Sequence, residues 1–292
     1  MAVWNLGSIN IDNVYRVTHL PAPGETLHAI DYAQGLGGKG ANMSVAIARA
    51  AARVTHIGAV GPEGAWTVER LLEYGVDTRC IAALGDHATG HANISVNEDG
   101  ENQIVVFSGA NNAITEDMVG AALSEAAAGD VLVMQNETNC QSYAAEIAKT
   151  LGLKVVYAAA PFDAEAVAEV LPFTDFLVLN EVEAAQLMAE MKRDLKDLGV
   201  PSIVVTLGSE GSKWMDVSAG SETHMPAIPV TPVDTTGAGD TFTGYLVAGL
   251  DRGMPMLQAL ALATQAGALM VTRQGTADVI PDLKDIEDAR LT

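Results

Sequence analysis

A glycine-rich stretch near the C-terminus, DTTGAGDTFTGYL (234–246), combines small residues with two aspartates. Gly237, Ala238 and Gly239 carry no bulky side chain and stand where an apolar helix should begin, so their backbone N–H groups can approach a ligand. The N-terminus of a helix carries partial positive charge and therefore favours an anion such as a phosphate. Asp240 falls in the first turn, where a carboxylate is stabilised and can accept a proton from a nearby hydroxyl group.

A proton acceptor beside an anion cradle is the arrangement that phosphoryl transfer to a hydroxyl group needs. The same spacing also suits a plain helix start, in which Asp240 is only a first-turn residue and the glycines only make the turn. The stretch by itself does not decide between these two interpretations.

A second glycine-rich stretch, GLGGKGAN (35–42), precedes an alanine-rich segment with helical spacing. It lacks the spacing of a Walker A loop and is not a clean dinucleotide-binding motif. Glycines together with Lys39 and Asn42 could hydrogen-bond a compact polyol. If this motif stood alone, a simple helix entry loop would be the favoured interpretation.

The composition narrows the class of protein. The 292 residues are 49% hydrophobic and 18% charged, enough for a large α/β core. A formal net charge of -21 argues strongly against binding nucleic acid and also repels anionic membranes. No apolar run reaches the ~18 residues of a membrane span, and the N-terminus lacks the features of a secretory signal. Only two cysteines, Cys80 and Cys140, occur far apart, so we expect a reducing, cytoplasmic compartment.

Short apolar runs of strand length recur along the chain, and helix-like segments separate them. This alternation is typical of a mostly parallel sheet covered by helices on both faces, so the expected fold class is α/β. The last two helices are expected at 238–252 and 255–273. The expected strands are AVWNLG near the N-terminus, VTHIGAVG, 130–135, 153–160, 175–180 and 201–208.

Two segments break this rhythm, at roughly 12–36 and 79–109. The first contains Pro21, Pro23 and several polar residues, and the second contains two β-like runs around NEDGEN, a hairpin signal. We expect these segments to form a small antiparallel sheet, called the lid here, inserted into one α/β domain that spans 1–292.

The two glycine-rich stretches together resemble the two signatures of the ribokinase-like (PfkB) family of carbohydrate kinases. The resemblance covers nearly the whole chain, because GSINIDN, PAPGET, GANNAIT, MQNE, LNEVEA and TLGSEG follow in the family's order. Several of these blocks are most similar to the ribokinase branch of the family. The resemblance implies a central, mostly parallel sheet flanked by helices, with a small β-sheet lid.

The resemblance also implies roles for individual residues. Asp240 matches the catalytic base, and Gly237, Ala238 and Gly239 match the anion hole. The implied contacts to the sugar are Asn10, Asp12, Gly38, Lys39, Asn42, Glu137 and Asp240 itself. As alternatives to sugar binding, Asn10 and Asp12 could cap a turn, and Lys39 could be a solvated surface charge.

ATP and cation sites are implied in the same way. Glu183, in the N-x-x-E motif NEVE, would hold Mg²⁺ through water, or it could simply follow an Asn cap at a helix start. The implied ATP contacts are Asn180, Thr206, Gly208, Ser209, Gly211 and Gly239. A monovalent cation, with K⁺ expected, would be held by Asp234, Thr236, Arg273 and Gly275.

The implied activity is ATP-dependent phosphorylation of the hydroxymethyl group of a small sugar, with ribose and ribose 5-phosphate as the first candidates. Two departures, AAAP (158–161) where NPAP is common and a shortened segment after LNEVEAAQLM, leave the substrate open. Fructokinase, 2-keto-3-deoxygluconate kinase and nucleoside kinase activities are alternatives. A catalytically silent sugar or nucleotide sensor is a weaker one, because Asp240 and both glycines are retained.

The lid raises two further expectations. His91 and Asn93 alternate along one predicted strand and so share a face. That face could cover the sugar and tune specificity, or it could equally face solvent. The family often dimerises through the lid sheet, and the apolar run QIVVF (103–107) could serve a homodimer.

Overall fold

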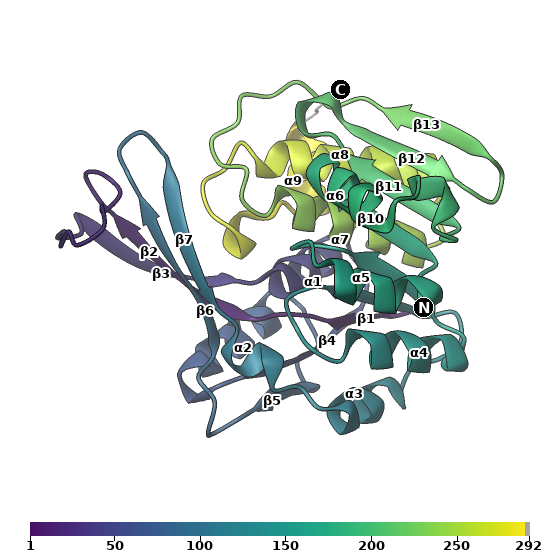
Figure 1. The fold of residues 1–292 in the computed structure, drawn as a ribbon, viewed down its shortest axis with the longest axis horizontal. Helices are drawn as coiled ribbons and strands as arrows, with labels where there is room; N and C mark the ends of the chain where they lie inside the picture. Colours follow the sequence, from purple (N-terminus) through teal and green to yellow (C-terminus); the bar gives the residue numbers. More distant parts are fainter. Residues whose placement is uncertain (290–292) are drawn as a thin grey trace.

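The computed structural model describes residues 1–289 and contains a large sheet with helices on both faces and a small sheet that projects from it (Figure 1). In the large sheet the order is β13-β12-β11-β10-β9-β8-β1-β4-β5. Neighbours from β11 to β5 are parallel, and β12 and β13 are antiparallel at one edge. The strands are β1 (Val3–Leu6), β4 (Val54–Val60), β5 (Ile81–Ala83), β8 (Val131–Gln135), β9 (Lys154–Ala158), β10 (Phe176–Asn180), β11 (Ser202–Thr206), β12 (Ser212–Asp216) and β13 (Ser221–Met225).

Two helical layers explain why the central strands are continuous apolar runs. Every residue of β1, β4 and β8 is buried, as expected for strands covered on both faces. One core cluster lies under α1 (Lys39–Arg49), α2 (Ala65–Glu73), α7 (Ala238–Asp251), α8 (Met256–Met270) and α9 (Leu283–Ala289). The other lies under α3 (Glu116–Leu123), α4 (Gln141–Leu151), α5 (Ala164–Val170) and α6 (Glu181–Met191).

The predicted fold class is confirmed, and the expected strands lie within two residues of those observed at each end. The last two helices, expected at 238–252 and 255–273, run over 238–251 and 256–270. The antiparallel pair β12 and β13 was not expected, because their sequences, SKWMD and SETHM, mix polar and apolar residues. In residues 1–289, no helix combines the length and apolarity needed to cross a membrane.

The small sheet has the order β3-β2-β6-β7 and forms the lid (Figure 1). Its strands are β2 (Asn10–Arg16), β3 (Asp31–Gly37), β6 (Gly90–Val96) and β7 (Asn102–Phe107). The prediction of an all-antiparallel lid is wrong, because β2 pairs with β6 in parallel. β5, which falls inside the expected lid segment 79–109, instead pairs with β4 in the large sheet.

The parallel strands end at one edge of the large sheet, where open α/β sheets bind ligands. Ser8 follows β1, Glu137 follows β8, Asn180 ends β10 and Thr206 ends β11. β2 leaves the same edge to enter the lid, and the start of α7 faces it. Residues far apart in the sequence are thereby brought to one place.

Candidate active site

The DTTGAGD stretch forms the start of α7, as predicted. Gly237 is the N-cap residue with φ 73°, a left-handed conformation that favours glycine. Asp240 lies in the first turn and is only 7% exposed. Asn42 Nδ2 donates to Asp240 Oδ2 at 2.9 Å, which ties the start of α7 to α1.

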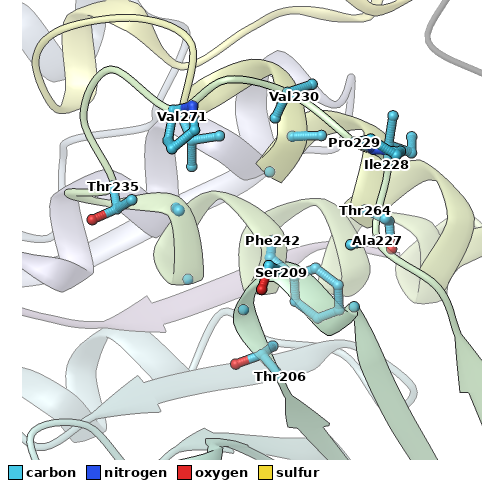
Figure 2. Close-up of a pocket in the computed structure, with 17 residues that line it drawn as sticks. Thr206, Ser209, Ala227, Ile228, Pro229, Val230, Thr235, Phe242, Thr264 and Val271 are labelled. Atoms are coloured by element: carbon cyan, nitrogen blue, oxygen red, sulfur yellow. The ribbon is translucent and has the colours of Figure 1, made fainter.

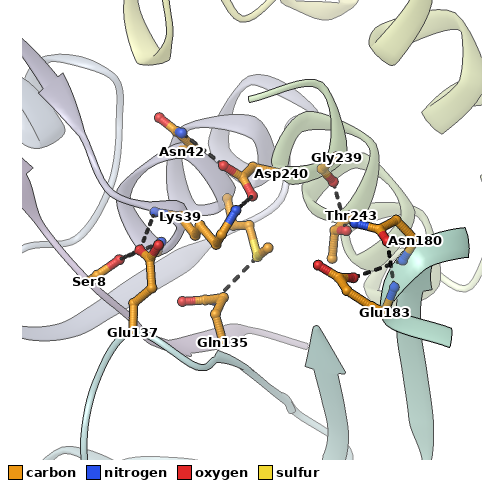
Figure 3. A network of polar contacts seen from close by, with 12 residues as sticks. Ser8, Lys39, Asn42, Gln135, Glu137, Asn180, Glu183, Gly239, Asp240 and Thr243 are labelled. Atoms are coloured by element: carbon orange, nitrogen blue, oxygen red, sulfur yellow. Dashed lines mark hydrogen bonds and ion pairs between the residues drawn. The ribbon is translucent and has the colours of Figure 1, made fainter. Parts of the chain in front are cut away.

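Three ionisable residues lie around Asp240, and with Asp240 and Asn42 they are called the polar cluster: Asp12, Lys39, Asn42, Glu137 and Asp240. Lys39 Nζ lies 4.0 Å from Asp240 Oδ1, and the backbone N–H of Lys39 donates to Glu137 Oε2 at 3.0 Å (Figure 3). The Asp240 carboxylate raises the pKa of Lys39, with a smaller contribution from Glu137 and against the effect of burial. The ammonium group is therefore charged at neutral pH.

Ser8 was not singled out from the sequence, although it lies in the GSINIDN block. Its hydroxyl donates to Glu137 Oε2 at 2.5 Å and accepts from the backbone N–H of Gly40 at 3.2 Å (Figure 3). Ser8 thus joins the end of β1, the start of α1 and the loop after β8. Its type alone carried no signal, because serine is common in loops.

Asp12 brings the lid into the cluster. Burial raises the pKa of Asp12 from 3.8 to about 7, and the negative charges of Glu137 and Asp240 add to the effect. A Cβ on Gly37, which is paired with Asn10 across β2 and β3, would lie 2.1 Å from the Asp12 carboxylate. Gly37, which the sequence did not single out, therefore leaves room for this side chain.

Asn10 and Gly38 lie beside the cluster. Asn10 is 6% exposed, and its Oδ1 accepts from Asn111 Nδ2 at 2.8 Å. Asn111, another residue not singled out from the sequence, also accepts from the Ile9 N–H at 2.9 Å and so fixes this turn. Gly38 has φ 95°, and a Cβ there would lie 2.9 Å from the carbonyl of Ser8.

The two interpretations of His91 and Asn93 are separated by the register of the lid. Asp12 is paired with Ala92, whereas His91 is paired with Ile11 and Asn93 with Asn13. Paired residues share a face, so His91 and Asn93 lie on the face opposite to Asp12. The idea that they cover the polar cluster is wrong: Asn93 is exposed, and His91 packs its ring against Phe107 at 5.2 Å.

A pocket of about 380 Å³, called the apolar pocket, adjoins the polar cluster (Figure 2). Of the residues predicted to contact ATP, Thr206, Gly208, Ser209, Gly211 and Gly239 line it, and Asn180 does not. Loop 227–232 also lines it, and the sequence did not point to this loop. The further lining residues are Ala227, Ile228, Pro229, Val230, Pro232, Thr235, Ala238, Phe242, Thr264, Gly267, Ala268 and Val271.

Asn180 and Glu183 form a capping box at the start of α6. The Asn180 side chain accepts from the Glu183 N–H, and Glu183 Oε2 accepts from the Asn180 N–H, both at 2.8 Å (Figure 3). Burial raises the pKa of Glu183, against the effect of the Asn180 hydrogen bond. Within residues 1–289, no three His, Cys, Asp or Glu side chains gather as a metal cage. Glu183 offers a single carboxylate here, which would suffice for a magnesium ion that keeps most of its water.

Asp234 lies behind the start of α7 and joins two loops. Its Oδ1 accepts from the Thr236 N–H at 2.9 Å, and its Oδ2 accepts from the Gly275 N–H at 3.2 Å. The Arg273 side chain points elsewhere, to the Val279 carbonyl and to Asp285. Asp234, Thr236 and Gly275, three of the residues predicted for the monovalent-cation site, are therefore adjacent.

Ala238, Gly239 and Asp240 form the junction of the two regions. Ala238 and Gly239 line the apolar pocket, while the next residue, Asp240, contacts Lys39 and Asn42 of the polar cluster. A group in the pocket and a group in the cluster can thus meet at one helix start.

Comparisons with known proteins agree with this arrangement. The model of the family described as "pfkB family carbohydrate kinase" matches residues 3–283. The ribokinase of Haemophilus influenzae is 36% identical, over 94% of each chain, and a deoxyribokinase of Salmonella typhimurium is 31% identical, over 97% of this chain and 96% of that one. The crystal structure of a ribokinase from Thermotoga maritima superposes with a TM-score of 0.89 at 30% identity, over 99% of this chain and 98% of that one. The chain therefore belongs to the pfkB family of carbohydrate kinases, as a kinase of the ribokinase type.

Proposed function

We propose that the protein transfers the γ-phosphoryl group of ATP to the hydroxymethyl group of a small sugar, with ribose as the substrate and ribose 5-phosphate as the product. The observation that carries the proposal is the junction at Asp240. Asp240 supplies a buried carboxylate to the polar cluster, and the two residues before it line a pocket with the size and lining of a nucleotide site.

In this proposal the polar cluster binds the sugar. Asp12, Glu137 and Asn42 offer carboxylate and amide groups to its hydroxyls, with Asn10, Gly38 and Lys39 around them. Asp240 takes the proton of the attacking hydroxyl, and the N–H groups of Gly237, Ala238 and Gly239 stabilise the charge on the transferring group. Closure of the lid over the sugar would keep water from competing as the acceptor.

The apolar pocket binds ATP in the same proposal, and Gly208, Ser209 and Gly211 lie along its phosphates with Thr206 and Asn180. Bound Mg²⁺ would neutralise phosphate charge, with Glu183 reaching it through water. Asp234 and the carbonyls of Thr236, Arg273 and Gly275 would hold K⁺. Since Asp234 joins the two loops behind the anion hole, that cation would keep the hole in shape.

A coupled assay of ADP release over a sugar and nucleoside panel tests the function, with and without K⁺. Turnover with ribose above that with 2-deoxyribose, fructose, 2-keto-3-deoxygluconate and nucleosides is the expected result. The deoxyribokinase relative makes 2-deoxyribose the second candidate. Absence of turnover with every acceptor would reject the kinase assignment.

The proposal extends to assembly and location. Because ATP is a cytoplasmic substrate, we place the enzyme in the cytoplasm. Ile104, Val105, Val106 and Phe107 of β7 are 50–63% exposed, and such an apolar patch supports a homodimer through the lid. Sedimentation analysis of the wild type and of Val105→Lys tests this: the wild type should be dimeric and the variant monomeric.

A further inference from the structure

Four polar side chains lie fully buried, at 0% exposure, beneath the polar cluster. They come from four elements of the large sheet and its helix layer: β1, α1, β4 and β8. Burial of such groups costs free energy unless they find hydrogen-bond partners. These residues, called the buried network, are Asn5, Ser44, His56 and Gln135.

The hydrogen bonds of the buried network fix its protons. His56 Nε2 lies 3.0 Å from the Gly7 carbonyl, and a carbonyl only accepts, so Nε2 carries the proton. Burial lowers the pKa of His56 from 6.5 to about 4, against the effect of that hydrogen bond, so the ring is neutral. The bare Nδ1 then accepts from the Ser44 hydroxyl at 2.8 Å.

The chain of bonds continues in one direction. The Ser44 oxygen accepts from Asn5 Nδ2 at 2.8 Å, and the second hydrogen of that amide goes to the Gly40 carbonyl at 2.7 Å. Asn5 Oδ1 accepts in turn from Gln135 Nε2 at 2.9 Å. Among the described residues, the buried Gln135 Oε1 is the one polar side-chain atom of the network without a partner, so the chain ends there.

The two backbone carbonyls that the network holds belong to glycines in direct contact. A Cβ on Gly40 would lie 2.4 Å from the Cα of Gly7, so the end of β1 and the start of α1 touch through their backbones. Ser8 follows Gly7, and Lys39 precedes Gly40. Both Ser8 Oγ and the Lys39 N–H donate to Glu137 Oε2, and Ser8 Oγ accepts from the Gly40 N–H.

We propose that the buried network positions the sugar side of the site by holding Gly7 against Gly40; this inference rests on the proposed function. None of its side chains needs to touch substrate, so these are positioning residues. A displacement of either glycine moves Ser8 or Lys39 and with them Glu137. It also moves α1, from which Asn42 reaches Asp240. Within residues 1–289, no residue that lines the apolar pocket hydrogen-bonds to a side chain of the network.

His56→Phe tests the proposal, because it keeps an aromatic ring and removes both hydrogen bonds. The KM for the sugar should rise about tenfold or more, while the KM for ATP stays within about twofold. His56→Gln should recover part of the loss, because its amide can donate to the Gly7 carbonyl. Thr55→Val is the matched control: Thr55 is the neighbouring buried polar residue on β4 and lies outside the network.

Three outcomes would overturn the proposal. One is a folded His56→Phe whose melting temperature falls while its sugar KM matches that of Thr55→Val. If His56→Phe does not fold, Ser44→Ala replaces it in the kinetic measurements, and its sugar KM is expected to rise about threefold to fivefold. A Ser44→Ala sugar KM equal to that of the wild type would be the second. The third is a set of ¹⁵N histidine spectra of the wild type that disagrees with the tautomer or the neutral state of His56 described above. The His56 signals are assigned by their loss in His56→Gln.

The spectra should show the Nε2–H tautomer of His56 without titration between about pH 5 and 8. A protonated Nδ1, or titration in that range, would show that the network is not as described. The spectra do not depend on turnover, whereas absence of turnover in the wild type would reject the proposed function. The two failures are therefore distinguishable.

Discussion

The polar cluster and the apolar pocket meet at Asp240 but are formed by different kinds of residues. The cluster holds four ionisable side chains, and hydrogen bonds and an ion pair among α1, α7 and the loops after β1 and β8 fix three of them. Among the described residues, those that line the pocket are uncharged, and its walls are largely loop 227–232, Phe242 and one side of α8. One region is therefore defined by the directions of polar groups and the other mainly by shape.

This difference predicts different tolerances. Hydrogen bonds weaken steeply with distance and angle, so small backbone shifts should be felt strongly in the polar cluster. Apolar contacts are non-directional and scale with buried area, so the pocket should tolerate changes that keep its volume. Dependence on pH should likewise come from the cluster, because titratable groups are found there and not in the pocket lining.

Asp240→Asn should have the largest effect, because it removes the proposed base at the junction and leaves both regions in place. The turnover number should fall by about 10²–10⁴-fold, with the KM values for sugar and ATP changed little. Single-turnover measurements with the best acceptor check this. A variant with near-normal turnover would contradict the assignment of the base.

Gly40→Ala should come next, because the added Cβ would meet the Gly7 Cα and the Ser8 nitrogen, both at 2.4 Å. Overpacking of this kind costs ~1–3 kcal/mol, so the sugar KM should rise by roughly 5–150-fold. Gly35→Ala is the matched control from the same glycine-rich stretch, because a Cβ there meets nothing within 4 Å. Equal sugar KM values in the two variants would show that close backbone contact is not what shapes the cluster.

The two regions also differ in how well the sequence predicted them. Asp240, Lys39, Asn42 and Glu137 stand in short motifs whose residue types carry a chemical signal, and the structure brings them together. The residues of loop 227–232 carry no such signal, because Ala, Val and Pro are common in any protein core. Their role as a pocket lining depends on how distant segments pack.

Other features required the three-dimensional arrangement for a physical reason. The face of His91 depends on the register between β2 and β6, and a shift by one residue would reverse it. The raised pKa of Asp12 depends on burial and on two carboxylates from distant segments. The pattern of apolar strands predicted the parallel part of the sheet, and the mixed composition of β12 and β13 concealed its antiparallel edge.

Asp12→Asn should separate binding from stability within the polar cluster. The pKa of Asp12 is raised to about 7 from 3.8, so its protonated form is favoured in the folded chain. Its contribution to stability is therefore fully present below about pH 4 and is lost as the pH rises through about 7. The variant stays neutral at every pH, and its melting temperature at about pH 8 should exceed that of the wild type by roughly 2–5 °C.

The same substitution should weaken sugar binding, because an ionised carboxylate accepts hydrogen bonds more strongly than an amide does. The sugar KM should rise by roughly 10–50-fold at about pH 8. In the wild type the sugar KM should fall as the pH rises through about 7, and in Asp12→Asn it should not. A variant that is less stable than the wild type at about pH 8 would contradict the cause given for the raised pKa.

Thr264→Val should have the smallest effect, and it tests whether the apolar pocket is defined by shape. The Thr264 hydroxyl donates to the Leu260 carbonyl at 2.9 Å within α8, so it is already engaged, and valine has nearly the same size. The KM for ATP should stay within about twofold, whereas Ala268→Leu, which fills the same wall of the pocket, should raise it about tenfold.

Ser8→Ala is the counterpart in the cluster, because it also removes one hydroxyl, but one that contacts Glu137 and Gly40. The sugar KM of Ser8→Ala should rise about fivefold to tenfold. A similar rise in the KM for ATP in Thr264→Val would mean that the pocket, like the cluster, depends on the direction of its hydrogen-bonding groups.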